Sequence, residues 1–473
     1  MSFTPTTRPP RGHAADRVIA SLRAELEASP PGAPLSSVRE LCERHGASPN
    51  TVQRAIAALV REGLVQTIPG RGSFVVGAPA REAAPDLGWQ AVVLGARPSV
   101  AEALDGLVAP LAPDAIPLRA GYLDPSLQPL GALHAALSRA SRRPGTWSRT
   151  PPEGSPELRA WFAREAGGGL TGADTLIVPG GQSALTVILR ALLQPGAPVL
   201  LESPTYPGAV AVARAAGLAP VPVPVDHEGV RPELLAAAFQ ATGARVFYCQ
   251  PTFSNPTGGL LGEARRRAVL EIAEAAGAFV VEDDYAHDLS SIPVPPTLVS
   301  RDAGRVIHVR SLTKSTAPGL RIAAIAARGP VFARLRAARL VDDLFVSGVL
   351  QEAALDLVTG PTWSRHLRQI QAELRSRRDA GAAALAALAP LGVRLWSRPL
   401  GGQNLWVGLP RGVEDRAFTA RMEAAGVALN AGGAFFPAEA QGSFVRLSVA
   451  GATVAQIEEG VRRMGRALQD QAR

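Results

Sequence analysis

Apolar residues recur every three to four positions in the first part of the chain, which is the period of a helix with one buried face. Three such segments lie at residues 14–26, 36–45 and 48–62. Ser36 or Ser37 can cap the second segment, and Gly46 can end it. The third segment begins near Ser48, with Pro49 in its first turn. Two helices joined by a short glycine-containing turn make a helix-turn-helix pattern.

The pattern changes from helical to alternating after these helices. The expected strands are residues 64–68 and 73–76, joined by a turn at 69–72. This hairpin completes a predicted compact unit, which we assign to residues 1–76. Residues 77–115 are rich in Ala, Pro and Gly, with one candidate short helix at 100–107, and are interpreted as a linker.

Short apolar strands alternate with helices from residue 116 onward, which is typical of an α/β fold with a mainly parallel sheet. The expected strands are residues 175–178, 199–202, 245–249, 278–282, 305–309 and 322–327. Longer helices are expected at 350–357 and 366–388, and strands of a smaller C-terminal α+β lobe near 404–408 and 444–449. We therefore predict a second domain over residues 116–473.

The composition is that of a globular protein with more than one domain. Its 473 residues are 47% hydrophobic and 19% charged, which allows a large buried core. The only cysteines, Cys42 and Cys249, are too few for a disulfide framework and lack metal-ligand spacing. No apolar stretch reaches the roughly 18 residues that span a bilayer, and the N-terminus has no signal-peptide core. We expect a cytoplasmic protein without a metal site, and its net charge of +8 permits an anionic partner without identifying one.

The basic residues are divided very unevenly between the two types. Of 49 Lys and Arg residues, 48 are Arg, and Lys314 is the only Lys. Arg cannot lose its proton near neutral pH, whereas a Lys amine can act as a base or form a Schiff base. Lys314 is therefore a candidate for amine chemistry. An ordinary surface lysine is an equally good explanation of why one Lys is present among so many Arg residues.

Polar clusters follow several predicted strands at their carboxyl ends, where open α/β sheets bind ligands. Gly181 and Gln182 lie in a Gly-rich loop that leads into an expected helix at 185–193, and its backbone amides can hold a phosphate. Tyr206 follows the next strand and can stack on a planar ring. Taken singly, each cluster is also explained by an ordinary connection or by packing.

A carboxylate and an amide follow two neighbouring strands. Asn255 lies in an Asn-Pro-Thr-Gly loop, which turn chemistry alone would also explain. Asp283 and Tyr285 come directly after the strand at 278–282. No cluster of His or carboxylate residues supports a metal there. A carboxylate with a phenol beside it suits the nitrogen of a pyridine ring, and solvated acids at a strand end are the alternative.

The only lysine follows the strand at 305–309. Ser311 precedes Lys314, and Arg321, which can bind a phosphate, comes shortly after it. Together, the clusters supply an amine, a phosphate site, a stacking ring and a partner for a pyridine nitrogen.

The order of these motifs resembles the aspartate-aminotransferase-like enzymes of pyridoxal-phosphate (PLP) fold type I, over residues 116–470, with 311–321 the most specific segment. The resemblance implies that Lys314 forms a Schiff base with PLP and that Asp283 pairs with the pyridinium nitrogen. It also implies that Asn255 and Tyr285 bind the ring 3-oxygen, that Tyr206 stacks on the ring, and that Gly181, Gln182, Ser311 and Arg321 hold the phosphate. Arg446 resembles the Arg that binds a substrate carboxylate, and a surface cation on an edge strand is the alternative.

The N-terminal unit resembles the winged helix-turn-helix of GntR-type transcription regulators over most of residues 13–76. The matching residues lie at 35–41, 48–55, 62–65 and 70–75. The resemblance implies DNA contacts from Arg39, Ser48, Asn50, Thr51 and Arg54, and from Arg71 on the wing. Charge alone adds little, since residues 1–76 hold nine Arg and six Asp plus Glu, 9 − 6 = +3. A GntR head on an aminotransferase-like body is the arrangement of the MocR-type regulators.

Two positions depart from the family patterns. Pro49 stands where the GntR family usually carries Arg, so one expected phosphate contact is missing. Residues 149–154 lack the Tyr often found near this point, so a cofactor contact from a partner subunit lacks its usual residue.

The predicted function is a transcription regulator that binds double-stranded operator DNA as a homodimer. It would hold PLP at Lys314 and respond to PLP, to an amino acid or amine, or to both, and its target genes would concern vitamin B6 or amino-acid metabolism. The alternative is an active PLP-dependent aminotransferase whose N-terminal unit serves only in interactions. A weak transaminase half-reaction is compatible with both.

Overall fold

The chain forms two compact units, Met1–Pro98 and Ser99–Arg473, and the division falls within the predicted linker. The structure, a computed structural model, describes residues 13–27, 29–76, 86–94, 104, 106 and 109–471. Among these residues no helix is long and apolar enough to cross a membrane.

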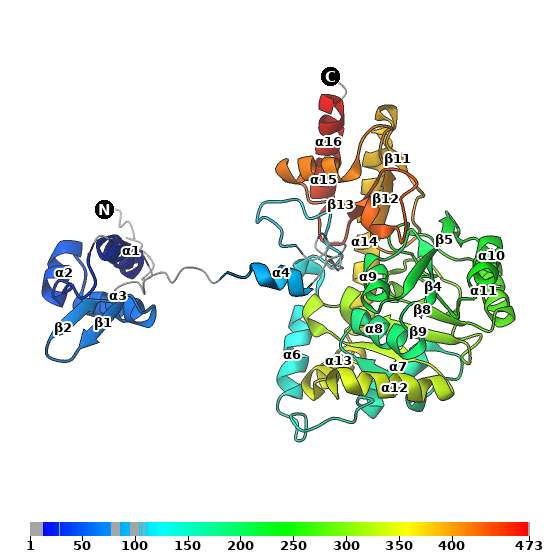
Figure 1. The fold of residues 1–473 in the computed structure, drawn as a ribbon, viewed down its shortest axis with the longest axis horizontal. Coiled ribbons are helices and arrows are strands. Elements are labelled where there is room, and N and C mark those ends of the chain that lie inside the picture. Colours follow the sequence, from blue (N-terminus) through cyan, green and yellow to red (C-terminus); the bar gives the residue numbers. More distant parts are fainter. Residues whose placement is uncertain are drawn as a thin grey trace, which may run out of the picture. The chain divides into compact units, whose positions relative to one another are not determined.

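In the first unit, the described residues up to 76 form three helices and a two-stranded antiparallel hairpin (Figure 1). These elements are α1 (His13–Glu27), α2 (Val38–His45), α3 (Pro49–Arg61), β1 (Val65–Ile68) and β2 (Gly72–Val75). Ser37, rather than Ser36, caps α2, and Gly46 ends it in a left-handed conformation. Ser48 caps α3, and Pro49 is its first residue. The predicted helix-turn-helix and hairpin are confirmed.

One small hydrophobic core joins these helices to the hairpin. Its buried residues include Val18, Leu22, Leu41, Val52, Leu59, Val65 and Val75. A further helix, α4 (Gly88–Leu94), lies in the expected linker and was not predicted. The helix expected at 100–107 lies outside the described residues, apart from Leu104 and Gly106.

The second unit is built on an eight-stranded sheet of order β3-β10-β9-β8-β7-β4-β5-β6. The strands are β3 (Thr175–Val178), β4 (Pro198–Ser203), β5 (Ala219–Asp226), β6 (Gly229–Val230), β7 (Val246–Cys249), β8 (Phe279–Asp283), β9 (Val306–Ser311) and β10 (Ala323–Ala326). The run from β9 to β5 is parallel, whereas β10 and β6 are antiparallel to their neighbours. The mainly parallel sheet is therefore confirmed.

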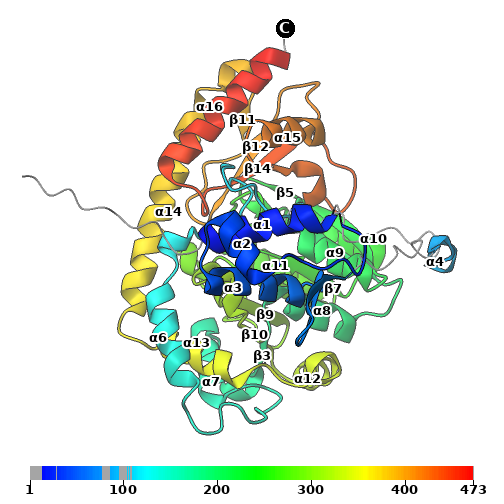
Figure 2. The ribbon, with the colours of Figure 1, turned by 90° about the vertical axis from the view of Figure 1, so that its left-hand side faces the viewer.

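Helices cover both faces of this sheet (Figure 2). They are α6 (Leu130–Ala140), α7 (Pro156–Ala166), α8 (Gly181–Leu192), α9 (Pro207–Ala215), α10 (Pro232–Thr242), α11 (Glu263–Ala275), α12 (Pro330–Asp343) and α13 (Gly348–Val358). Because successive strand residues point to opposite faces, Leu201 packs in the core formed with α8, α9 and α12, and Leu200 packs in the core formed with α7, α10 and α11.

A smaller lobe closes the chain with a four-stranded antiparallel sheet of order β11-β12-β14-β13. Its elements are α14 (Trp363–Ala386), β11 (Arg394–Leu395), β12 (Asn404–Gly408), α15 (Asp415–Ala424), β13 (Asn430–Ala431), β14 (Phe444–Ser448) and α16 (Val454–Gln471). Short 3-10 helices η1 to η7 lie at Pro125–Leu127, Gly172–Asp174, His287–Leu289, Leu312–Lys314, Pro318–Leu320, Ala389–Leu391 and Gly432–Phe435.

Two predictions about the large sheet were wrong in detail. Helix α8 begins at Gly181, not at residue 185, so Gly181 and Gln182 form its first turn. Strand β5 was not predicted, because prolines interrupt its apolar pattern at every second position. In a parallel strand, every second residue directs its backbone N–H and C=O to the same neighbouring strand. The three prolines therefore all lack an N–H on one side of β5, and β4 pairs with the other side. Only the two-residue β6 lies beyond.

Candidate functional site

The exposed face of α3 is the candidate DNA interface of the first unit. Asn50 and Arg54 are four positions apart, so they lie together on this face, opposite the buried Val52 and Leu59. The other predicted contacts are the exposed Arg39 on α2 and Arg71 in the hairpin turn, with Ser48 and Thr51 at the N-terminus of α3. The first unit therefore presents these side chains at a helix N-terminus, a helix face and a hairpin turn, which are the usual points of contact in this motif.

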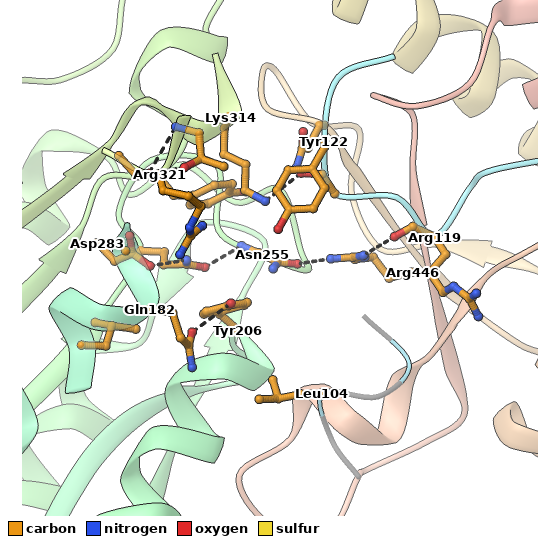
Figure 3. A pocket seen from close by; sticks show the side chains of 18 residues that line it. Leu104, Arg119, Tyr122, Gln182, Tyr206, Asn255, Asp283, Lys314, Arg321 and Arg446 are labelled. Carbon is orange, nitrogen blue, oxygen red and sulfur yellow. Dashed lines mark hydrogen bonds between the residues drawn. The ribbon is translucent and has the colours of Figure 1, made fainter. Parts of the chain in front are cut away.

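A cavity of about 250 Å³ lies at the carboxyl ends of the strands of the large sheet (Figure 3). Every predicted cofactor and carboxylate residue lines it: Gly181, Gln182, Tyr206, Asn255, Asp283, Tyr285, Ser311, Lys314, Arg321 and Arg446. The sequence did not single out other residues of its wall: Leu104, Arg119, Gly121, Tyr122, Leu185, Gln250, Thr313 and Gln403. Residues that are far apart in the chain are thus brought to one pocket between the large sheet and the small lobe.

Lys314 reaches this pocket from η4, directly after β9. Its Nζ donates to the carbonyl oxygen of Gly121 at 2.7 Å and lies 4.2 Å from the centre of the Tyr122 ring. Burial, with a smaller contribution from the positive charge of Arg446, lowers the pKa of Lys314 to about 7. A substantial fraction of this amine is therefore neutral, and nucleophilic, near neutral pH.

The phosphate end of the pocket is formed by the start of α8 and by Arg321. No side chain caps α8, so the N–H groups of its first turn are available to an anion. Arg321 lies in the left-handed region, at φ 51°, and its Nη2 donates to the carbonyl oxygen of Pro179 at 3.0 Å. A Cβ at Gly180 would come within 2.4 Å of that Nη2, so only glycine lets the guanidinium approach the loop. Ser311, whose hydroxyl donates to Thr313 at 3.0 Å, completes this end.

Asp283 is the last residue of β8, and two neutral side chains hold its carboxylate. Tyr248 and Gln250 both donate to its Oδ2, at 2.7 and 2.8 Å. Burial raises the pKa of Asp283, and these hydrogen bonds oppose the shift. Tyr206 is fixed through its hydroxyl, which donates to Gln182 Oε1 at 3.0 Å.

Tyr285 and Asn255 lie between the two ends of the pocket. The Tyr285 hydroxyl donates to the carbonyl oxygen of Phe253 at 2.6 Å and accepts from Asn404 Nδ2 at 3.2 Å. Asn255 Oδ1 accepts from Arg446 Nη1 at 3.2 Å. The two residues are therefore held by protein groups beside the cavity, as Figure 3 shows for Asn255.

Arg446 is buried, and its hydrogen-bond partners among the described residues are all neutral. Its Nη2 donates to Asn430 Oδ1 at 2.6 Å and to the carbonyl oxygen of Arg119 at 2.9 Å, while its Nε has no partner among the described residues. Burial lowers the pKa of Arg446 to about 10. Because it is 3% exposed and β14 lies between β12 and β13, the surface-cation alternative is wrong. A buried guanidinium without a carboxylate partner is suited to bind an anionic ligand.

The partners of Arg446 also hold the end of the linker. Asn430 Nδ2 donates to the carbonyl oxygen of Gly106 at 3.0 Å. Arg119 Nη2 donates to the carbonyl oxygens of Ala109 and Pro110, at 3.3 and 3.2 Å. The segment that enters the second unit is thus attached to the groups around Arg446.

Sequence reasoning missed the side chains that support the first layer of the pocket. For Tyr248 and Gln250 a signal was present. They are alternate residues at the end of β7, and the register of β7 with β8, in which Cys249 lies opposite Glu282, places residue 250 beside Asp283. For Asn430 and Arg119 the sequence carries no such signal, because β13 has only two residues and residue 119 lies in an irregular segment before α6.

Comparisons with known proteins agree with this division into two units. Residues 14–75 match the family described as "Bacterial regulatory proteins, gntR family", and residues 118–464 match "Aminotransferase class I and II". The chain belongs to the class I and II aminotransferase family. With its GntR helix-turn-helix, it is a regulator of the MocR type.

Relatives of both kinds are found. The chain is 31% identical over 405 residues to the vitamin B6 salvage pathway transcriptional repressor PtsJ of Salmonella typhimurium, with 85% of each chain covered. It is 28% identical over 454 residues to the HTH-type transcriptional regulator YdfD of Bacillus subtilis, with 94% of this chain and 93% of the relative covered. A crystal structure of the α-aminoadipate aminotransferase LysN of Thermus thermophilus matches at a TM-score of 0.72 and 31% identity, covering 78% of this chain and 97% of that one.

The fold and the family imply PLP as the cofactor, and the pocket fits it. The buried amine of Lys314, with its lowered pKa, suits the aldehyde, and the uncapped start of α8 with Arg321 suits the phosphate. Asp283 Oδ1, which has no hydrogen-bond partner among the described residues, suits the ring nitrogen. The close approach of Arg321 to Gly180 is the most specific part of this fit, since any side chain at position 180 would displace the guanidinium.

Proposed function

We propose that this GntR-type regulator binds PLP covalently through Lys314 and changes its DNA binding in response to PLP, to an amino-acid ligand, or to both. The observation that carries the proposal is the buried amine of Lys314, held 2.7 Å from a backbone carbonyl inside a pocket with a phosphate site at one end. In the chain, residues 1–76 would serve as the DNA-binding head, 77–115 as the linker and 116–473 as the sensing and dimerising body.

Different residues of the pocket would hold different parts of the cofactor. PLP, when bound, supplies an electron sink conjugated to the amine it carries. Lys314 would supply the attaching amine, and Asp283 would hold a proton at the ring nitrogen. Tyr206 would stack on the ring, Asn255 and Tyr285 would bind the 3-oxygen, and Gly181, Gln182, Ser311 and Arg321 would hold the phosphate.

Arg446 favours a ligand with a carboxylate. Its neutral partners leave the charge of the guanidinium uncompensated inside the pocket, and a carboxylate can bind such a group in a bidentate manner. An amino acid, rather than a simple amine, therefore suits both Lys314 and Arg446. The similarity to a vitamin B6 salvage repressor supports genes of vitamin B6 or amino-acid metabolism as targets.

A homodimer is part of this proposal. Trp147, Val341 and Leu344 are large apolar side chains that are 76%, 78% and 56% exposed. Their segments pack together, since Thr150 donates to Val346 O at 3.0 Å and Arg339 donates to Pro152 O at 2.8 Å. A second copy would cover this apolar surface.

DNA binding is the property that tests the proposal. The purified protein is titrated with a duplex from the intergenic region beside its own coding sequence and with a scrambled duplex, at several salt concentrations, with and without PLP. We expect tighter, salt-sensitive binding to the intergenic duplex and a change of affinity on adding PLP. Equal binding to both duplexes would contradict the proposal. The complete pocket also favours the alternative, an aminotransferase with an accessory domain, which multiple turnovers of an amino acid and a keto acid without DNA binding would establish.

A further inference from the structure

Gln250, directly after β7, bonds to three different groups beneath the pocket. Its side-chain Nε2 donates to Asp283 Oδ2 at 2.8 Å, and its Oε1 accepts from the backbone N–H of Asn255 at 2.9 Å. Its own backbone N–H donates to the buried carboxyl of Glu202 at 2.9 Å. Because one neighbour can only accept and another can only donate, the orientation of the amide is fixed.

At one end of this amide, the carboxylate of Asp283 is held by a single oxygen. Tyr248 and Gln250 both donate to Oδ2, whereas Oδ1 has no hydrogen-bond partner among the described residues. Oδ1 is therefore the oxygen left for a ring nitrogen in the cavity that Asp283 lines. Rotation of this carboxylate would break both hydrogen bonds at Oδ2.

At the other end, the same amide holds the loop that contacts Arg446. Gln250 Oε1 fixes the backbone of Asn255, and the side-chain Oδ1 of Asn255 accepts from Arg446 Nη1 at 3.2 Å. Hydrogen bonds thus run without interruption from Asp283 through Gln250 and Asn255 to Arg446, a row that can be followed in Figure 3.

We propose that Gln250 is a positioning residue that holds Asp283 and Asn255 in one rigid arrangement, so that the ring-nitrogen end and the carboxylate-binding end of the pocket are set by one amide. This inference rests on the proposed binding of PLP at Lys314. It adds a connection through protein groups between Asp283, at the ring-nitrogen end of the pocket, and Arg446, at the carboxylate-binding end.

Two substitutions separate the parts of this role. Gln250→Glu keeps the shape but places an acceptor and a negative charge against Asp283, next to the buried Glu202, which favours protonation of Asp283. Gln250→Met removes both side-chain hydrogen bonds. With less negative charge at Asp283 the ring nitrogen loses its proton more readily, and the visible absorption of the bound cofactor should then titrate at a higher pH.

The matched control is Gln351→Met. Gln351 is also fully buried, accepts from the Ser155 backbone N–H at 2.7 Å and donates to Val346 O at 2.8 Å, but it lies on α13 outside the pocket. A second comparison is Tyr248→Phe, which removes a donor from Asp283 and leaves Asn255 untouched.

The experiment uses the full chain loaded with PLP and records the absorbance titration, the melting temperature and the affinity for succinate as a non-reactive carboxylate probe. We expect both Gln250 variants to shift the titration by about one pH unit or more and to weaken succinate binding at least about fivefold. Tyr248→Phe should shift the titration but keep succinate affinity within about twofold, and Gln351→Met should change only the melting temperature.

One further outcome would support the positioning role. Gln250→Met would lose the cofactor although its melting temperature equals that of Gln351→Met. Wild-type titration and succinate affinity in both Gln250 variants would overturn it, as would effects no larger than those of Gln351→Met. If borohydride fixed no PLP to Lys314 in the wild-type protein, the proposed function itself would fail, and this inference with it.

Discussion

Two arginines, one in each unit of this protein, have opposite surroundings. In the first unit, the side chain of Arg39 is 90% exposed and its ion pair with Glu43, at 3.3 Å, is open to solvent. In the second, Arg446 is buried among neutral acceptors. An exposed cation attracts a polyanion over a distance and is screened by salt, whereas a buried one has already lost its hydration and binds only an anion that fits.

A second buried arginine makes the contrast sharper. Arg310 donates to Asp288 at 2.8 Å and to Glu165 at 3.0 Å. Burial lowers the pKa of Arg310, but the nearby carboxylates outweigh burial and leave the pKa raised. Arg446 is equally buried but has no carboxylate partner in the part of the chain that the structure describes, and its pKa is lowered. We expect this difference to distinguish a structural arginine from one placed for a ligand, and variants of the two residues can test that distinction.

The largest expected effect is that of Lys314→Ala. Because Lys314 is the only lysine, its removal should abolish covalent attachment of PLP after borohydride reduction. DNA affinity measured without PLP should stay within about twofold of wild type. Mass spectrometry of the reduced protein and a DNA titration check the two parts, and a reduced adduct in the variant would show that another group attaches the cofactor.

Stability should distinguish the two buried arginines. Arg310→Met leaves Asp288 buried without its partner, which should lower the free energy of unfolding of the second unit by roughly 3–5 kcal/mol. Arg446→Met removes a buried charge that has no carboxylate partner, and should change that free energy by less than about 1–2 kcal/mol. Urea unfolding of both variants measures this, and equal destabilisation would contradict the distinction.

Although Arg446→Met should have the smaller effect on stability, it should strongly weaken ligand binding. In Arg446→Met the affinity for a carboxylate ligand such as succinate should fall roughly 30-fold or more, because a buried charged partner is lost, at about 2 kcal/mol or above. PLP attachment at Lys314 should persist. Calorimetry with the PLP-loaded protein provides the measurement, with Arg54→Ala as the control that should bind succinate normally.

Attachment of PLP should depend on pH with a midpoint near the pKa of Lys314, about 7. Only the neutral amine attacks an aldehyde, so below this pKa the rate should fall about tenfold for each pH unit, and above it the rate should level off. Stopped-flow absorbance between pH 5 and 9 measures whether the attachment rate rises with pH and then levels off. A rate that still rises steeply at pH 9 would mean that the amine remains protonated in the pocket.

The smallest expected effect concerns the exposed arginines of the head. Arg71→Ala should weaken DNA binding uniformly across sequences and reduce the slope of log affinity against log salt by about one. Arg54→Ala, on the face of α3, should instead cost about 1–3 kcal/mol and reduce discrimination between sequences. Titrations at three salt concentrations separate the two. Identical salt slopes in wild type and Arg71→Ala would remove the wing from the DNA interface.

The sequence predicted the parts of this molecule whose information is local. Helical period, Ser48 and Gly46 defined the helix-turn-helix, and short apolar runs defined most of the parallel strands. Most of the pocket residues were found because they follow strands whose carboxyl ends meet at one edge, whereas Arg446, within β14, was found only through the family resemblance. Strand β5 was missed because alternating prolines resemble a loop, although their common spacing fits an edge.

Contacts between distant segments could not be predicted in the same way. Arg446 and Arg119 are 327 positions apart, and Asn430 reaches back 324 positions to Gly106. These pairs meet because the segment of Ile116 and Leu118 packs on the small lobe, with backbone hydrogen bonds to Gly426 and Ser448. No periodic pattern in the sequence indicates these contacts, so the neutral surroundings of Arg446 could be seen only in the structure.

The arginine-rich composition has a further consequence for a protein that handles an aldehyde. Free PLP reacts with exposed lysine amines, and a DNA-binding surface that relied on lysine would lose positive charge and affinity as its own signal accumulated. Residues 1–76 contain nine arginines and no lysine. Residues 1–76 therefore offer the cofactor no lysine side chain to modify.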